Sequence, residues 1–134
     1  NYTENYYKDL LDANKNIIIS SPAISGQKVY ELINMLKEKQ ASGVQITIVT
    51  WTPDSYGFGD AAYWMQLHED MCKAGFYIKT VEESCERFAV IDQEVVWYGN
   101  INLLAKTKVD DSIMRVLSNE IAGELMEIIF GNNS

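Results

Sequence analysis

The chain has 134 residues, of which 47% are hydrophobic, which suits a single domain with a buried core and excludes a disordered chain. Nineteen acidic residues against eleven basic ones give a net charge of −8, which weighs against broad electrostatic binding to nucleic acid or to an anionic membrane. No apolar run approaches the roughly 20 residues of a membrane-spanning helix. With one His, two Cys and no Cys-x-x-Cys pair, we expect no metal, no cofactor and no membrane partner, in a reduced, cytoplasmic setting.

The first half of the chain predicts alternating helices and strands. Residues 1–15 have the spacing of an amphipathic helix, and the β-branched run over 16–20 predicts a strand buried on both faces of a sheet. An apolar stripe predicts a helix over 26–41, and a second β-branched run predicts a strand over 44–50. A strand, a helix and a strand in this order predict a right-handed parallel crossover.

The second half adds further strands and two more helices. Asp92 and Gln93 fall between two strands and have the length of a hairpin turn. The expected elements are a helix over 61–74 capped by Asp60, strands over 76–80, 87–91, 94–98 and 112–117, and a helix over 119–130 capped by Ser118. We therefore expect an α/β fold in which a mixed β-sheet is flanked by helices. We expect one domain over residues 1–134, with the helix over 1–15 packed on it. Because the chain starts at Asn1 rather than Met, we expect it to be a fragment of a larger protein.

The most informative segment runs from residue 85 to residue 102. It reads Cys-Glu-Arg-Phe-Ala-Val-Ile-Asp over 85–92, and Gly-Asn-Ile-Asn follows over 99–102 after a gap of six residues. This spacing resembles the HxKxxxxD motif of the phospholipase D superfamily, which continues with six residues and then GSxN or GGxN. Arg87, Asp92, Gly99 and Asn102 stand at the Lys, Asp, Gly and Asn of the motif, whereas Cys85 replaces the His and Asn100 replaces the Ser or Gly.

The resemblance extends over residues 16–130. Within the family, the sequence is similar to the variant of the domain that is appended to bacterial helicase-like and restriction-associated proteins. It implies a single-motif unit that pairs with a second motif copy. In such pairs one His attacks phosphorus, the other protonates the leaving oxygen, and the Lys and Asn residues hold the non-bridging oxygens. The implied catalytic positions are Cys85, Arg87, Asp92, Asn102 and Asp111, and the implied phosphate-binding positions are Arg87, Asn100 and Asn102.

Three functions remain open at this point. The leading hypothesis is a catalytically degenerate accessory domain of a larger DNA-processing, helicase-like protein, serving interaction or weak phosphate or nucleic-acid binding. The alternative is an active phosphodiesterase or nuclease that works as a dimer with a non-standard nucleophile. A third possibility is a purely structural dimerisation module. The expected partners are a second copy of the chain or other domains of the parent protein, with nucleic acid reached through that parent.

The candidate residues also have simpler interpretations. Cys85 is either a thiolate activated by Arg87 or an inert, buried cysteine. Arg87 is either an anion ligand or one half of an ion pair with Asp92 or Asp111. His68, the only histidine, falls on the third predicted helix and is more typical of a structural residue than of an acid catalyst. A further group of aromatic residues, Trp51, Tyr56, Phe58, Tyr63 and Trp64, indicates a protein interface more than stacking on bases.

Overall fold

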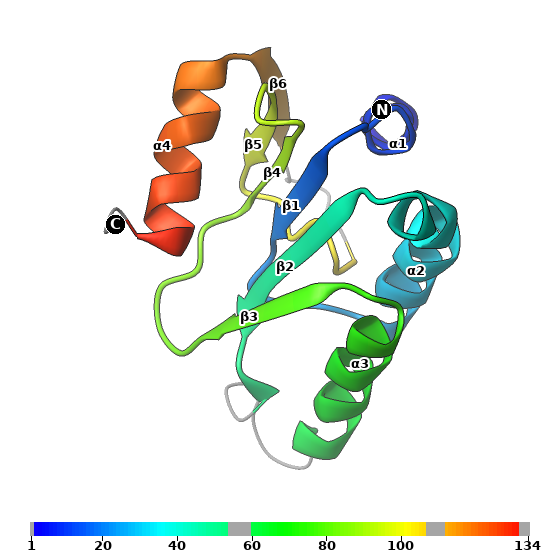
Figure 1. The fold of residues 1–134 in the computed structure, drawn as a ribbon. Coiled ribbons are helices and arrows are strands. Elements are labelled where there is room, and N and C mark those ends of the chain that lie inside the picture. Colours follow the sequence, from blue (N-terminus) through cyan, green and yellow to red (C-terminus); the bar gives the residue numbers. More distant parts are fainter. Residues whose placement is uncertain (1, 54–59, 107–111, 132–134) are drawn as a thin grey trace.

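The computed structural model describes residues 2–53, 60–106 and 112–131. Asp111 and the aromatic pair Tyr56 and Phe58, which were expected to contribute to function, lie outside the described residues. The described chain forms an α/β domain with a mixed sheet and four helices (Figure 1). The predicted fold class is therefore confirmed.

The elements follow one another largely as predicted. The helices are α1 (Thr3–Leu11), α2 (Gly26–Ala41), α3 (Ala61–Lys73) and α4 (Asn119–Phe130). The strands are β1 (Asn16–Ser20), β2 (Gln45–Trp51), β3 (Tyr77–Val81), β4 (Phe88–Ile91), β5 (Val95–Gly99) and β6 (Ile113–Leu117). They form one sheet in the order β3-β2-β1-β4-β5-β6. Strands β1 to β3 are parallel, β4 runs antiparallel to β1, and β5 and β6 continue the sheet as antiparallel neighbours.

The sheet lies between two layers of helices. Helices α1, α2 and α3 cover one face, and α4 alone covers the other (Figure 1). Successive side chains of β1 point to opposite faces, so Ile17 and Ile19 join the core cluster under α1 to α3, while Ile18 joins the cluster under α4. Both clusters bury these residues almost completely. This explains why β1 is an uninterrupted apolar run rather than an alternating one.

Two of the predicted local signals are confirmed and one is wrong. The Ser118 side chain accepts a hydrogen bond from the Ile121 amide and so caps α4. Asp92 and Gln93 lie in the predicted hairpin turn between β4 and β5 and have positive φ angles of 56° and 61°, but the register pairs Ile91 with Val95, so Glu94 belongs to the turn as well. Asp60, by contrast, precedes α3 but has helical backbone angles and makes no capping hydrogen bond. An N-cap side chain reaches the first turn only when its own backbone is extended, and Asp60 is not.

Helix α1 is held on the sheet by one half-buried carboxylate. Asp9 accepts a hydrogen bond of 2.8 Å from the indole nitrogen of Trp97 on β5, and it forms an ion pair with Arg115 on β6. Tyr6 packs edge-on against the Trp97 ring, with 5.5 Å between ring centroids. The first helix is thereby joined to the far end of the chain.

Candidate phosphate-binding site

The strand directions bring the two halves of the motif to one edge of the sheet. Ser20, the last residue of β1, pairs with Phe88, the first residue of β4, and Phe88 pairs in turn with Tyr98 near the end of β5. The segments 85–87 and 99–102 therefore lie together, beside the carboxyl ends of β1 and β2. Ligands of open α/β sheets commonly bind at such ends.

Arg87 and Asn102 form the polar centre of this edge. The Arg87 Nε donates a hydrogen bond of 3.3 Å to the Asn102 Oδ1, which also lies 3.5 Å from the Ala23 amide nitrogen. Both side chains are half-buried. Since its oxygen accepts these bonds, the Asn102 amide directs its NH2 group away from them. No ion pair to Arg87 occurs among the described residues, and Asp111, its other expected partner, lies outside them.

Cys85 precedes Arg87 by two residues, and its side chain packs on the α4 side of the sheet. Its sulfur lies 3.6 Å from the Ser20 hydroxyl, and it packs against the core cluster under α4. A pocket of about 170 Å³ opens in front of it, with Lys79 in the wall. Burial raises the pKa of the Cys85 thiol, and this outweighs the opposing effects of the Ser20 hydrogen bond and the Arg87 charge. The thiol is therefore protonated at neutral pH, which disfavours the hypothesis of an activated thiolate.

Gly99 and Asn100 close the sheet at this edge. A Cβ at Gly99 would lie 2.1 Å from the Ser112 carbonyl oxygen, so only glycine allows β6 to approach this closely. The next residue exchanges two hydrogen bonds with Ser112, because the Asn100 amide donates to the Ser112 carbonyl and the Asn100 Oδ1 accepts from the Ser112 amide. The Asn100 side-chain oxygen thus holds the strands together, while the side chain itself stays exposed.

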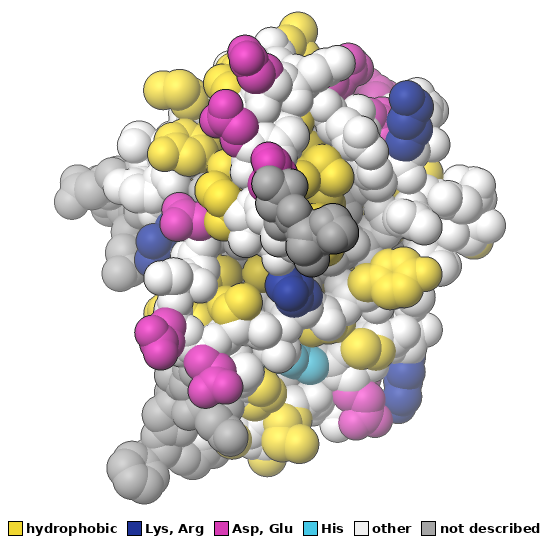
Figure 2. All heavy atoms as spheres, turned by 60° about the vertical axis from the view of Figure 1, so that its left-hand side comes forward, with side chains coloured by type: hydrophobic (Ala, Val, Ile, Leu, Met, Phe, Trp, Pro, Cys, Tyr) yellow, Lys and Arg dark blue, Asp and Glu magenta, His cyan; other side chains and the backbone are white. Residues whose placement is uncertain are grey.

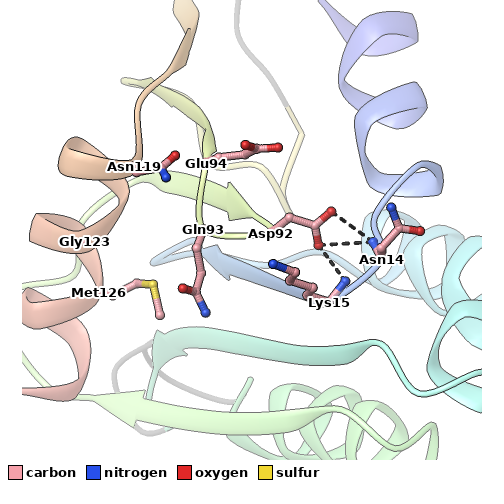
Figure 3. A pocket seen from close by; sticks show the side chains of 8 residues that line it. All are labelled: Asn14, Lys15, Asp92, Gln93, Glu94, Asn119, Gly123 and Met126. Atoms are coloured by element: carbon pink, nitrogen blue, oxygen red, sulfur yellow. Dashed lines mark hydrogen bonds between the residues drawn. The ribbon is translucent and has the colours of Figure 1, made fainter.

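Asp92 is not brought to the other motif residues. It follows the last residue of β4, whereas Arg87 precedes the first, so the strand separates them by roughly 16 Å at 3.3 Å per residue. Its carboxylate accepts hydrogen bonds of 2.7 to 3.2 Å from the backbone amides of residues 14, 15 and 16. Figure 3 shows the bonds from Asn14 and Lys15. The pocket beside it is polar, has a volume of about 340 Å³ and lies at the opposite edge of the sheet. Asp92 therefore fixes the entry into β1, and the ion pair with Arg87 is not formed.

Comparison with protein-family models matches residues 6–130 to the cardiolipin synthase, PLD-like domain. The chain belongs to the phospholipase D-like family. A comparison with curated proteins gave no match.

Solved structures of other proteins share the fold. Nuc from Salmonella typhimurium, a phospholipase D family member, has a TM-score of 0.68 and 16% identity, over 94% of this chain and 82% of that chain. NucT from Helicobacter pylori has a TM-score of 0.63 and 9% identity, over 94% and 83%. TrmBL2, an archaeal chromatin protein described as binding DNA in a novel mode, has a TM-score of 0.63 and 12% identity, over 96% of this chain and 47% of that chain. At these identities the likeness concerns the fold.

The only imidazole of this phospholipase D-like chain lies on α3. His68 is half-buried there, and its Nε2 is buried without a hydrogen-bond partner among the described residues. Burial lowers its pKa, so the ring is neutral at pH 7. No hydrogen bond in the described part of the chain joins it to Cys85 or Arg87. His68 therefore lies on a different element from the motif residues and makes no described hydrogen bond to them.

Three buried hydroxyl residues that sequence reasoning missed hold this edge in place. The Ser20 hydroxyl donates to the Glu86 carbonyl, the Ser21 hydroxyl donates to the Ala23 carbonyl, and the Thr50 hydroxyl donates to the Pro22 carbonyl. All three are at most 1% exposed. Their signal in the sequence is the position of Ser20 and Thr50 at the carboxyl ends of otherwise apolar strands, where a buried polar group needs a backbone partner.

Neither a metal cluster nor a membrane-spanning helix occurs in the described ranges. No group of three or more His, Cys, Asp or Glu side chains there is arranged to hold a metal ion. None of the described helices has the length and apolar character needed to cross a bilayer.

Proposed function

We propose that this chain is a catalytically degenerate phospholipase D-like domain that binds a phosphate group weakly, as an accessory part of a larger DNA-processing protein of the helicase-like kind. The observation that carries this proposal is the contrast within one edge of the sheet. Arg87 and Asn102 remain joined at 3.3 Å, while the position of the nucleophile holds the thiol of Cys85.

The loss of chemistry follows from the properties of that thiol. Cleavage of a phosphodiester needs a nucleophile that is available at neutral pH and an acid for the leaving oxygen. Burial raises the pKa of Cys85, which keeps it in its unreactive protonated form. The neutral ring of His68 lies on another element and makes no hydrogen bond to the motif in the described ranges. Neither group therefore takes over the catalytic role of the missing imidazole.

The retained pair supports binding of a phosphate oxygen. The terminal nitrogens of Arg87 form a planar fork that matches two oxygens of a phosphate group, and the Asn102 NH2 adds a neutral donor. Three acidic residues, Glu82, Glu83 and Glu86, are exposed in the same segment and repel an approaching anion. With a net charge of −8 over the chain, we expect dissociation constants in the millimolar range for an isolated phosphate.

The expected partners follow from the single motif in the chain. A second copy, or another domain of the parent protein, would place a second set of phosphate-binding side chains opposite Arg87 and Asn102. The fold shared with the DNA-binding protein TrmBL2 supports a nucleic-acid partner reached through the parent. Sedimentation of the chain at increasing concentration tests the first of these expectations.

The decisive experiment measures hydrolysis and binding separately. The unmodified chain, Cys85→Ala and Cys85→His are each incubated with a chromogenic phosphodiester and with single- and double-stranded DNA. We expect no turnover by the first two and turnover only by Cys85→His. Turnover by the unmodified chain that Cys85→Ala abolishes would instead establish the alternative, an active phosphodiesterase with a sulfur nucleophile.

Binding is measured by titrating inorganic phosphate into the isotopically labelled chain and following its amide resonances. We expect shifts confined to residues 20–25, 85–88 and 99–104, and we expect Arg87→Ala to remove them. Arg115→Lys is the matched control, because Arg115 is paired with Asp9 and faces α1. Equal binding by Arg87→Ala and Arg115→Lys would overturn the phosphate site and favour a purely structural module.

A further inference from the structure

An apolar groove lies beside α4, at the side of the sheet where β5 and β6 end the domain. It has a volume of about 340 Å³ and its walls come from two strands and one helix. The strand wall carries Tyr98 and Met114, which are 50% and 63% exposed, and the helix wall carries Ile121 and Ile128, which are 40% and 62% exposed. Four large apolar side chains on one groove exceed the scattered exposure that is normal on a protein surface.

The groove exists because one helix is too narrow to cover this sheet. Six strands spaced at about 4.8 Å span roughly 24 Å between the outer strands, whereas a helix covers about 10 Å. The buried side chains of α4 pack against residues of β1, β2, β4 and β5, namely Ile18, Val49, Phe88, Val90 and Val96. The outer part of β5 and all of β6 therefore lack a helix on this face, although the opposite face has three.

Charge indicates what would cover the groove. Glu124 lines it, and Glu120 and Glu127 lie exposed along the same outer side of α4, a helix without a single basic residue. In the upper left of Figure 2, hydrophobic and acidic side chains lie next to one another on this face. A second copy of the chain would bring its own α4 carboxylates into the contact, and like charges across an interface are unfavourable.

We propose that this groove binds a basic amphipathic helix of a partner protein. The apolar stripe of that helix lies on Tyr98, Met114 and Ile128, and its lysine or arginine side chains face the carboxylates of α4. The length of β6, five residues or about 17 Å, corresponds to about 11 helical residues. A further hollow lined by Tyr98, Gly99 and Ser112 continues the groove toward the edge that holds Arg87 and Asn102. A bound helix would thus end beside the phosphate site, although the inference does not depend on that site.

The test uses a fluorescent helical peptide of about 14 residues, with leucines at i, i+3, i+4 and i+7 and lysines elsewhere, and a twin with glutamates in place of the lysines. Fluorescence anisotropy with the full chain measures binding, and amide shifts locate it. We expect the lysine peptide to bind on β5, β6 and α4, and the glutamate twin not to bind. We expect Glu124→Gln to weaken binding and to reduce its dependence on salt.

A matched pair of surface substitutions separates the groove from general surface charge. Met114→Lys introduces a cation into the groove and should weaken binding at least about tenfold. Tyr77→Lys adds the same charge to the opposite edge strand at a side chain of similar exposure, 61%, and should leave the affinity within about twofold. No binding of the lysine peptide, or equal weakening by both substitutions, would overturn the proposal. A dimer in sedimentation that Met114→Lys dissociates would overturn it as well, because the occupant would then be a second copy.

Discussion

Replacing Asp92 by Ala should destabilise the fold without changing the proposed phosphate site. The Asp92 carboxylate accepts hydrogen bonds from three consecutive backbone amides, those of residues 14, 15 and 16, and so joins the hairpin after β4 to the entry of β1. A hydrogen bond to a charged group contributes about 1.5–3 kcal/mol when it is shielded from water. Two of these amides are exposed and regain water when the carboxylate is removed. We therefore expect a total loss of about 2–3 kcal/mol rather than the full sum.

The loss is measured by urea and thermal unfolding followed by circular dichroism. For 134 residues the entropy of unfolding is about 0.28 kcal/mol/K, so each kcal/mol displaces Tm by roughly 3.5 °C and Asp92→Ala should lower it by about 7–11 °C. Asp92→Asn should lose less, because asparagine tolerates the positive φ of 56° and keeps one acceptor oxygen. Glu94→Ala is the control: its side chain makes no hydrogen bond within the described ranges, and we expect a change within about 0.5 kcal/mol.

The opposite pattern would refute this reasoning. If Asp92→Ala unfolded at the same urea concentration as the unmodified chain but lost phosphate binding, Asp92 would belong to the binding site. In that case Asp92 would have to act on the bound phosphate despite its separation from Arg87 along β4. Retained phosphate binding by a destabilised Asp92→Ala would support the two separate roles.

Three further substitutions test other parts of the structure. Gly99→Ala should cost about 1–3 kcal/mol in urea unfolding, because its methyl group would meet the Ser112 carbonyl oxygen at 2.1 Å. Tyr6→Phe should raise Tm by a few degrees, since it removes a hydroxyl that is buried without a partner in the described chain. Burial lowers the pKa of His68 below its usual 6.5. As the pH falls through 6.5, the unfolded state therefore binds a proton at His68 more readily than the folded state does, and the folded state loses stability. His68→Gln should remove this effect and flatten the pH dependence of stability between pH 7 and 5.

The fold could be predicted from the sequence because its signals are local. The bounds of α2 and α4 agree with the predicted ranges, since a stripe of apolar residues and a clear end mark each of them. The hairpin turn that contains Asp92 and Gln93 was predicted at the right place, although it is one residue longer than the predicted two. Asp60 shows the limit of such signals, because residue type does not reveal whether the backbone before a helix is extended.

The site could be predicted only in part, because its geometry depends on contacts between distant segments. The pairing of Arg87 with Asn102 follows from the motif spacing. Asp92 lies at the other end of β4 from Arg87, because the four residues that separate them in the motif form that extended strand. The pKa of Cys85 could not be predicted, because it depends on burial at the end of α4, a helix that begins more than thirty residues later.

The architecture explains how position 85 can carry a thiol in place of the motif His while the neighbouring residues keep their positions. The edge that carries the motif is held by groups that play no part in phosphoryl chemistry: the buried hydroxyls of Ser20, Ser21 and Thr50, and the close approach of β6 at Gly99. Cys85 itself makes only weak contacts through sulfur, at 3.6 to 3.9 Å, and fills apolar space under α4. A change at position 85 therefore alters reactivity while the cradle of Arg87 and Asn102 keeps its position. For the same reason Cys85→His should fold, and its turnover then reports on chemistry alone.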